Sequence, residues 1–214
     1  MSSSSREIIL NQVRHALTQK AELNAKPDLH APIYFKPANK SSLDFFTENF
    51  QKTKGQLFLC KNEAAFPAVF EPLVKQKAFN HIFAWEEKII SLLNRTKVSF
   101  SSSSQDNFVQ ADLGVTSCES LIARTGSILF SSATASGRRL SIFPHTNLVI
   151  AYTSQLKEDI IDGLKEIKTS HKELPSMISL TSGPSRTADI EKTLVLGAHG
   201  PKELILILIN DTSI

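Results

Sequence analysis

The sequence predicts an open α/β sheet, mostly parallel and Rossmann-like, flanked by helices. From residue 42 onward, short apolar runs alternate with stretches of helical spacing, which is the pattern of strand–helix–strand crossovers. The last run, residues 204–209, is apolar at every position, as expected for a strand covered on both faces of a parallel sheet. A chain of 214 residues is also long enough to bury a core without a metal or disulfide.

Composition excludes several classes of protein. Hydrophobic residues make up 41% and charged residues 21% of the chain, a profile unlike that of disordered or fibrous proteins. The net charge of +3 gives no reason to expect a nucleic-acid or membrane partner. The N-terminus lacks a basic region followed by an apolar stretch, and no apolar run is long enough to span a bilayer. We therefore expect a cytoplasmic protein.

Only two cysteines are present, Cys60 and Cys118. This count argues against a disulfide framework and a cysteine-rich zinc site. An iron–sulfur cluster held by one chain needs about four cysteines, so we expect no iron–sulfur cluster in this chain, and any other cofactor stays unidentified. The six histidines show no metal-ligand spacing, and no metal site is predicted. Cys118 is either a nucleophile or, as free cysteine more often is, a small buried residue.

The first 40 residues are expected to form an N-terminal helical arm, separate from an α/β domain over residues 41–214. Serine and glutamate at capping-box spacing, followed by apolar residues at helical spacing, predict a helix over residues 5–23. Three prolines between residues 27 and 37 favour an extended connector. The arm is expected to dock on its own domain or on a partner, and a homo-oligomer stays open.

The first half of the α/β domain contains the following expected elements. Ser42 is placed to start a helix that runs to Lys54 and ends at Gly55. Short apolar runs predict strands over residues 56–60 and 80–84, with a weaker strand over 98–101. Helical spacing predicts helices over 63–77, which two prolines interrupt, and over 86–93.

The second half follows a polar break of four serines at residues 101–104. A short helix over 118–123 is expected to end in a Thr-Gly turn that leads into a strand over 127–130. Apolar runs predict strands over 147–152, 177–180 and 204–209, and helical spacing predicts a helix over 157–167. A helical turn is expected at Asp189.

Three segments combine glycine with polar residues beside predicted strands: residues 114–127, 136–139 and 182–201. The third follows a predicted strand, and ligands of open α/β sheets bind outside the carboxyl ends of strands. Gly183 lets a backbone approach a ligand. Arg186, between two hydroxyl residues, offers a fork of donors suited to carboxylate or phosphate. An elaborate turn without a ligand is an equally good interpretation of this segment.

We expect the three segments to converge on one cleft that binds a small anion. The candidate anion-binding residues are Thr125, Gly126, Ser127, Arg138, Arg139, Gly183, Ser185, Arg186, Thr187 and Gly200. The catalytic residues stay unassigned, with His199, Asp189 and Glu191 as candidates for moving a proton. Structural alternatives stay open for each segment, including a turn before a strand at 125–127, solvated charges at 138–139, and carboxylates that only hold Arg186.

These segments, taken in order, resemble the LUD domain family of lactate-utilisation proteins, and within it the protein C type. The resemblance covers roughly residues 40 to 210. The stretch from Ser182 to Glu191 with its following His-Gly-Pro is the most specific part. The matching stretches are Ala111–Thr116, Leu121–Ser127, Ser136–Arg139, Asn147–Ile150, Ser182–Glu191 and Leu196–Pro201.

The resemblance implies a fold similar to the NagB/RpiA/CoA transferase-like superfamily. It implies a cluster-free component or accessory protein, catalytic or not, that acts with iron–sulfur partner subunits in the oxidation of L-lactate to pyruvate. Arg124 stands directly before Thr-Gly, where many relatives have Glu, so a carboxylate mechanism is not expected there. The alternative function is a stand-alone transferase or hydrolase acting on an acyl, sugar-phosphate or CoA-like anionic substrate.

Overall fold

The computed structural model describes residues 5–18, 39–104, 107–190, 193–197 and 199–212, with only the backbone described at 17, 187–190 and 193–196. The chain divides into two compact units, residues 1–36 and 37–214. The first unit contains helix α1 (Ser5–Thr18), on which Ile8, Ile9 and Val13 are exposed. The expected continuation of this helix to residue 23 lies outside the described residues.

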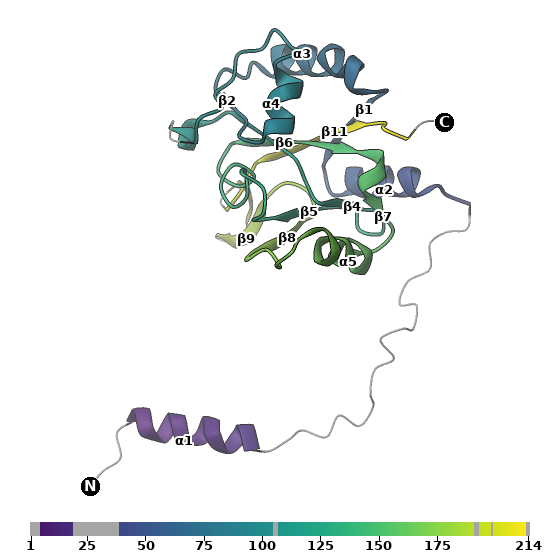
Figure 1. The fold of residues 1–214 in the computed structure, drawn as a ribbon. Helices are drawn as coiled ribbons and strands as arrows, with labels where there is room; N and C mark the ends of the chain where they lie inside the picture. Colours follow the sequence, from purple (N-terminus) through teal and green to yellow (C-terminus); the bar gives the residue numbers. More distant parts are fainter. Residues whose placement is uncertain (1–4, 19–38, 105–106, 191–192, 198, 213–214) are drawn as a thin grey trace. The chain divides into compact units, whose positions relative to one another are not determined.

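The second unit is built on a five-stranded sheet in which every pair of neighbours is parallel (Figure 1). The strand order is β1-β11-β6-β3-β2. The predicted open, mostly parallel α/β sheet is therefore confirmed. The strands are β1 (Gln56–Cys60), β2 (Ile82–Phe83), β3 (Leu113–Thr116), β6 (Thr146–Tyr152) and β11 (Glu203–Ile209).

Strand β11 is buried on both faces, as its continuous apolar run predicts. Leu204, Leu206 and Leu208 enter the core that contains the phenylalanines of α2 (Ser42–Lys52). Ile205, Ile207 and Ile209 enter the opposite core, with α3 (Phe66–Lys77) and α4 (Glu87–Leu93). All six side chains are at most 2% exposed. Burial of each contributes about 1.5–3 kcal/mol, so this strand joins the two cores.

A second, four-stranded sheet was not anticipated from the sequence. Its order is β7-β4-β5-β8, with antiparallel pairing except between β4 and β7. Its apolar inner side packs with α2, while α5 (Ile160–Ser170) places Gly163 against Ile122 and Leu129 on the outer side. The layers follow one another in Figure 1 from α3 and α4 through the two sheets to α5. The strands are β4 (Ser120–Ile122), β5 (Ser127–Ser131), β7 (Leu156–Lys157) and β8 (Ile178–Thr181).

Two expected helical segments are strands. Residues 118–123 contain β4 because Leu121 and Ile122 are fully buried and pair with β5, which outweighs a weak helical spacing. The helical turn expected at Asp189 is part of β9 (Arg186–Ile190), which pairs with β10 (Thr193–Leu196). Several β-branched residues in these two strands favour this outcome.

Other boundaries shift for local reasons. The helix expected over 63–77 begins as a 3-10 turn, η1 (Glu63–Ala65), and α3 then starts with a proline in its first turn. Helix α5 starts after Asp159, which caps it in a capping box. The strand expected over 98–101 is reduced to one bridge between Phe83 and Ser101. Two further 3-10 turns are η2 (Phe108–Gln110) and η3 (Thr153–Gln155).

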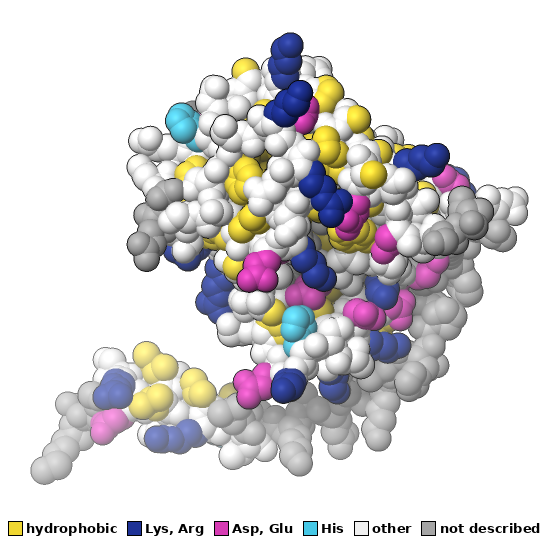
Figure 2. Space-filling model, turned by 45° about the horizontal axis from the view of Figure 1, so that its top comes forward, with side chains coloured by type: hydrophobic (Ala, Val, Ile, Leu, Met, Phe, Trp, Pro, Cys, Tyr) yellow, Lys and Arg dark blue, Asp and Glu magenta, His cyan; other side chains and the backbone are white. Residues whose placement is uncertain are grey.

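The surface carries no strong charge bias on the side shown in Figure 2, where Lys and Arg side chains intermingle with Asp and Glu. This agrees with the small net charge of +3. Among the described helices, none combines the length and the apolar character needed to cross a bilayer.

Gly126 provides a test of how the second sheet docks on α2. Its φ is +59°, and an added Cβ would lie 2.2 Å from the Phe50 backbone nitrogen. We expect Gly126→Ala to lower the free energy of unfolding by about 2–4 kcal/mol, because a left-handed backbone and a backbone overlap both oppose it. Gly200→Ala, whose Cβ would meet the Ser185 Cβ at 3.2 Å, serves as the control and should lose less than about 1 kcal/mol. Urea unfolding of both variants measures this, and equal losses would contradict the assignment.

Candidate functional site

One large cavity lies at the carboxyl ends of the parallel strands. It has a volume of about 640 Å³ and is called the carboxyl-edge cavity. Residues that directly follow β1, β3, β6 and β11 line it together with one side of α4. This is the place where open α/β sheets bind ligands, because several strand ends and their loops meet there. The main polar lining residues are Glu63, Lys88, Arg95, Ser117, Tyr152 and Asp211.

The acidic side chains of this cavity are already engaged. Glu63 accepts a hydrogen bond of 2.7 Å from the Tyr152 hydroxyl and pairs with Arg95 at 3.2 Å. Asp211 accepts from the backbone and hydroxyl of Ser154 at 3.0 and 2.6 Å. These contacts join the loops after three different strands. They also leave the carboxylates with little capacity to bind a cationic ligand.

Lys88 is the cation without an ion pair in this cavity, as far as the described residues extend. It lies in the first turn of α4 and is exposed. The hydroxyl of Ser117 is held on the same side by Glu86, to which it donates. An uncompensated ammonium beside hydroxyl groups favours an anionic ligand. The carboxyl-edge cavity can therefore bind a small carboxylate.

Two groups in the cavity are held in their neutral forms. Burial, together with the hydrogen bond to Glu63 and nearby negative charge, raises the pKa of Tyr152 to about 12. Burial raises the pKa of the Cys118 thiol, and the charges of Glu86 and Glu119 add to the effect. A thiol of this kind is a poor nucleophile because the thiolate is the reactive form. The interpretation of Cys118 as a small buried residue fits the structure.

None of the anion-binding candidates predicted from sequence lines the carboxyl-edge cavity. The position of this cavity follows from the general tendency of ligands to bind at the carboxyl ends of parallel strands. Ser117, Ser154 and Asp211 come shortly after β3, β6 and β11 and line the cavity. Sequence spacing pointed instead to the strand before Gly183, which is β8. That strand belongs to the second sheet, so the rule did not apply to it.

Four of the predicted residues line a second cavity, of about 280 Å³, at the amino ends of β6 and β11. This amino-edge cavity contains Gly183, Ser185, His199 and Gly200. The backbone of Ser185 is paired with the Pro201 carbonyl at 2.9 Å and the Gly197 amide at 3.0 Å. No hydrogen bond joins the side chains of Ser185 and His199, both of which are described. The serine hydroxyl and the imidazole therefore do not form a nucleophile–base pair in this structure.

The Thr125–Ser127 turn packs against α2. Asn49 donates hydrogen bonds to the carbonyls of Ala123 and Arg124 at 3.0 and 3.1 Å. Gly126 abuts the helix backbone, and the Ser127 hydroxyl lies 2.5 Å from that of Ser182. The Thr125 hydroxyl is buried without a hydrogen-bond partner among the described residues. The turn therefore has a packing role that its sequence alone did not show.

Arg124 occupies the position where the resemblance suggested a carboxylate. Its guanidinium pairs with Asp159 through Nε at 2.8 Å and Nη2 at 3.0 Å. Burial acts to raise the pKa of Asp159, but the hydrogen bond from Arg124, the Ile160 amide and the Arg124 charge outweigh it, so the pKa lies below its usual value. The pair ties the β4–β5 turn to the cap of α5.

The expected single cleft does not form, because the three arginines lie in different surroundings. Arg186 donates to the Thr53 carbonyl at the end of α2. Arg139 lies over the rings of Trp85 and Phe108, with its Cζ 5.0 and 5.5 Å from their centroids. Arg138 donates to the Ser176 hydroxyl at 2.6 Å. Arg138 and Arg139 lie on the connection from β5 to β6, and Arg186 lies on the β9–β10 hairpin.

The remaining candidates are less fully described. Thr187 and Asp189 lie on β9, where only the backbone is described, and Glu191 lies outside the described residues. Within the described part of the chain, no group of three or more His, Cys, Asp or Glu side chains is arranged to hold a metal.

Comparison with known proteins identifies the family of this chain. A model of the LUD domain matches residues 43–209, most of the α/β unit. The chain belongs to the LUD domain family. The membership agrees with the resemblance carried by the Ser182–Glu191 segment and its companions.

Individual relatives match part of the chain. A lactate utilization protein C of Shouchella clausii is 32% identical over 61% of this chain and 62% of its own length. Another lactate utilization protein C, from Halalkalibacterium halodurans, is 35% identical over 48% of this chain and 46% of its own. An uncharacterized protein of Neisseria meningitidis is 34% identical over 48% and 44%. The chain thus spans about half the length of the curated relatives it matches.

One similar solved structure is a DUF162 family protein from Deinococcus radiodurans. It superposes with a TM-score of 0.58 over 78% of this chain and 96% of its own, at 18% identity. At this identity the likeness shows the fold alone, and it agrees with the α/β architecture described above.

Arg186 is expected to stabilise the fold and not to bind a ligand. Arg186→Gln removes its hydrogen bond to the end of α2 and should lower the free energy of unfolding by up to about 1 kcal/mol, because exposure weakens the bond. The affinity for small carboxylates should not change. Thermal melts and titrations of Arg186→Gln, with the exposed Lys172→Gln as control, measure both quantities. Lost affinity with unchanged stability would restore the binding role.

Tyr152 should make stability fall at high pH. The folded protein holds its proton up to a pKa of about 12, whereas the unfolded chain releases it near 10. The free energy of unfolding should therefore decrease as pH rises above about 10, by about 1 kcal/mol after allowing for partial exposure. Near-ultraviolet phenolate absorbance should show one of the two tyrosines titrating late. Tyr152→Phe should remove this late step, and its persistence would contradict the assignment.

Proposed function

We propose that this chain is a component of a lactate-utilisation system and that the carboxyl-edge cavity binds L-lactate or its product pyruvate. Family membership and the names of two relatives support the metabolic context. The observation that carries the proposal is Lys88, the cation without an ion pair in that cavity among the described residues. A carboxylate bound there gains a charge-assisted hydrogen bond.

The neighbouring groups suit the rest of such a ligand. The Ser117 hydroxyl and the loop residues after β6 surround a 2-hydroxy or 2-oxo group with polar atoms. Arg95 offsets the charge of Glu63, so Glu63 repels the ligand carboxylate less than a free carboxylate does. The protonated Tyr152 adds no negative charge at neutral pH.

Oxidation of L-lactate to pyruvate releases two electrons and two protons. We propose that partner subunits carrying iron–sulfur clusters accept the electrons. The support is the cysteine count, since two cysteines fall short of the roughly four that a cluster held by one chain requires. Both cysteines are also buried, one in each of the two main cores. In this proposal, the chain binds and positions the organic acid for its partners.

The ligand is tested first. L-lactate and pyruvate should raise the melting temperature, and the neutral amide of lactate should not. Lys88→Met keeps the aliphatic stem but removes the charge, so it should weaken binding by about 1.5–3 kcal/mol, or roughly tenfold to a hundredfold. Lys75→Met, on the exposed surface of α3, is the matched control. Equal affinity in both variants would rule out this site.

The role in oxidation is tested by reconstitution. The full chain mixed with iron–sulfur proteins of a lactate-utilisation system should support reduction of their clusters by L-lactate, and the Lys88→Met chain should support it less. Turnover of acyl, sugar-phosphate or CoA-like substrates by the isolated chain would instead favour a stand-alone transferase or hydrolase.

A further inference from the structure

A third hollow lies where the connection from β5 to β6 passes the beginning of β8. It measures about 360 Å³ and is separate from the carboxyl-edge cavity in its lining residues. Its main lining residues are Ser132, Thr134, Ser136, Gly137, Arg138 and Ser176. We call it the serine–arginine hollow. Its lining contains four hydroxyl groups and no carboxylate, as that of the amino-edge cavity does, but it adds two arginines.

We propose that the serine–arginine hollow binds a phosphate group, free or as a phosphate ester. Arg138 supplies the charge. Its Nη2 donates to the Ser176 hydroxyl at 2.6 Å, and no carboxylate pairs with it among the described residues. A guanidinium that bonds only to a neutral hydroxyl retains donors for an oxyanion.

The hydroxyl groups of the hollow keep O–H protons that they can donate to a bound phosphate. Ser132 Oγ accepts from the Met177 amide at 3.1 Å, and Ser176 Oγ accepts from Arg138. These two oxygens lie 3.1 Å apart, so only one of them can donate to the other and at least one O–H proton is left. Thr134 Oγ1 accepts from the Gly137 amide at 3.1 Å and also keeps its proton. Several donors with one guanidinium match the oxygens of a phosphate better than the two of a carboxylate.

Ser136 supplies an independent observation. The residue is 2% exposed, and its hydroxyl has no hydrogen-bond partner among the described residues. Leaving a buried hydroxyl unpaired costs about 1–3 kcal/mol, and such a group calls for an explanation. A phosphate oxygen in the hollow would satisfy it.

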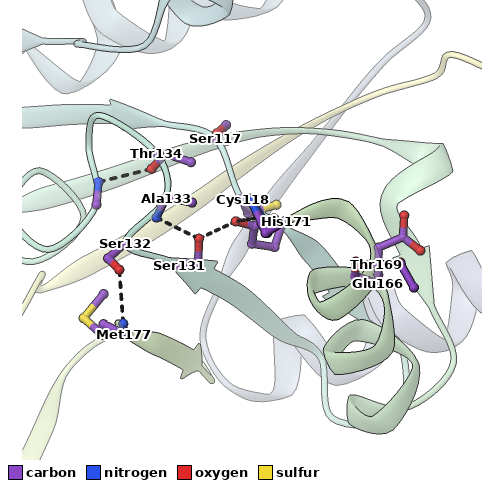
Figure 3. A network of polar contacts seen from close by, with 12 residues as sticks. Ser117, Cys118, Ser131, Ser132, Ala133, Thr134, Glu166, Thr169, His171 and Met177 are labelled. Atoms are coloured by element: carbon purple, nitrogen blue, oxygen red, sulfur yellow. Dashed lines mark hydrogen bonds and ion pairs between the residues drawn. The ribbon is translucent and has the colours of Figure 1, made fainter. Parts of the chain in front are cut away.

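The hollow is also held in place before any ligand arrives. Figure 3 shows residues 131–134 at the end of β5, where hydrogen bonds hold the side chains of Ser131 and Ser132. Ser131 donates to Glu119 and accepts from the Ala133 amide at 3.0 Å. Glu119 in turn lies 3.1 Å from the ring of His171 at the end of α5. A supported loop binds with a smaller loss of conformational entropy.

Arg139, the next residue, provides a matched control. It borders the same hollow, but its guanidinium lies over Trp85 and Phe108. Loss of that contact should lower stability and should weaken phosphate binding less than loss of the Arg138 guanidinium does. The two adjacent arginines therefore have separable roles, one for the ligand and one for the fold.

The test is titration of the full chain with inorganic phosphate and with glycerol phosphate, followed by phosphorus NMR, with acetate added as a competitor at equal ionic strength. We expect saturable phosphate binding that Arg138→Lys weakens tenfold or more, because lysine lacks the guanidinium fork. Arg139→Lys, the same change at the neighbouring arginine whose guanidinium lies over two rings, should weaken phosphate binding less than Arg138→Lys does and should lower the melting temperature. Tighter binding of glycerol phosphate than of inorganic phosphate would identify an ester as the ligand, and the reverse would identify the free ion.

Ser136→Ala separates binding from folding. If the hydroxyl serves the ligand, the variant should be as stable as the parent or more stable, and should bind phosphate less tightly. Binding of acetate as strong as that of phosphate, unchanged phosphate affinity in both Arg138→Lys and Ser136→Ala, or equal losses in the Arg138 and Arg139 variants would overturn the proposal. The lactate experiments on Lys88 do not affect these outcomes, because the two cavities share no lining residue.

Discussion

The burial of β11 on both of its faces is the constraint on which the rest of the structure depends. This strand pairs with β1 on one side and β6 on the other, so that Ile205 lies beside both Gln56 and Leu148. Its leucines and isoleucines enter opposite cores. Because β1 and β11 are far apart in the chain, the parallel sheet forms only when these distant segments meet, which makes its contacts strongly non-local. The same strand has one end at the amino-edge cavity and the other at the carboxyl-edge cavity.

The end of α2 is the second organising feature. Asn49 holds the β4–β5 turn, Gly126 fits against the helix backbone, and Gly183 approaches the Thr53 carbonyl with a φ of +82°. Arg186 donates to the same carbonyl. Several residues within the part of the chain that the LUD domain model matches therefore join the second sheet to α2. At Gly126 and Gly183 the positive φ and the nearby backbone leave no room for a larger side chain. A tight packing requirement can therefore limit the residue type at a position as a bound ligand would.

The polar chemistry is distributed over both edges of the parallel sheet. The carboxyl edge has Lys88 and paired carboxylates, which suit a small organic acid. The β5–β6 connection lines both the amino-edge cavity and the serine–arginine hollow. Hydroxyl groups line both, and the hollow adds Arg138 and Arg139. The two proposed sites share no lining residue, so a carboxylate and a phosphate would not compete for them.

The sequence by itself determined the parallel sheet, most of its helices and the burial of β11, because apolar periodicity reports directly which faces are covered. It also determined the family, through the Ser182–Glu191 segment and its companions. Tertiary structure alone decided that 118–123 and 186–190 are strands, since pairing with distant partners outweighed local preference. It also decided that Arg138, Arg139 and Arg186 make contacts with different parts of the molecule. Lys88, Ser117 and Tyr152, by contrast, line one cavity. Which side chains share a cavity depends on strand order, and strand order arises from pairings between residues far apart in the chain, which a local pattern does not encode.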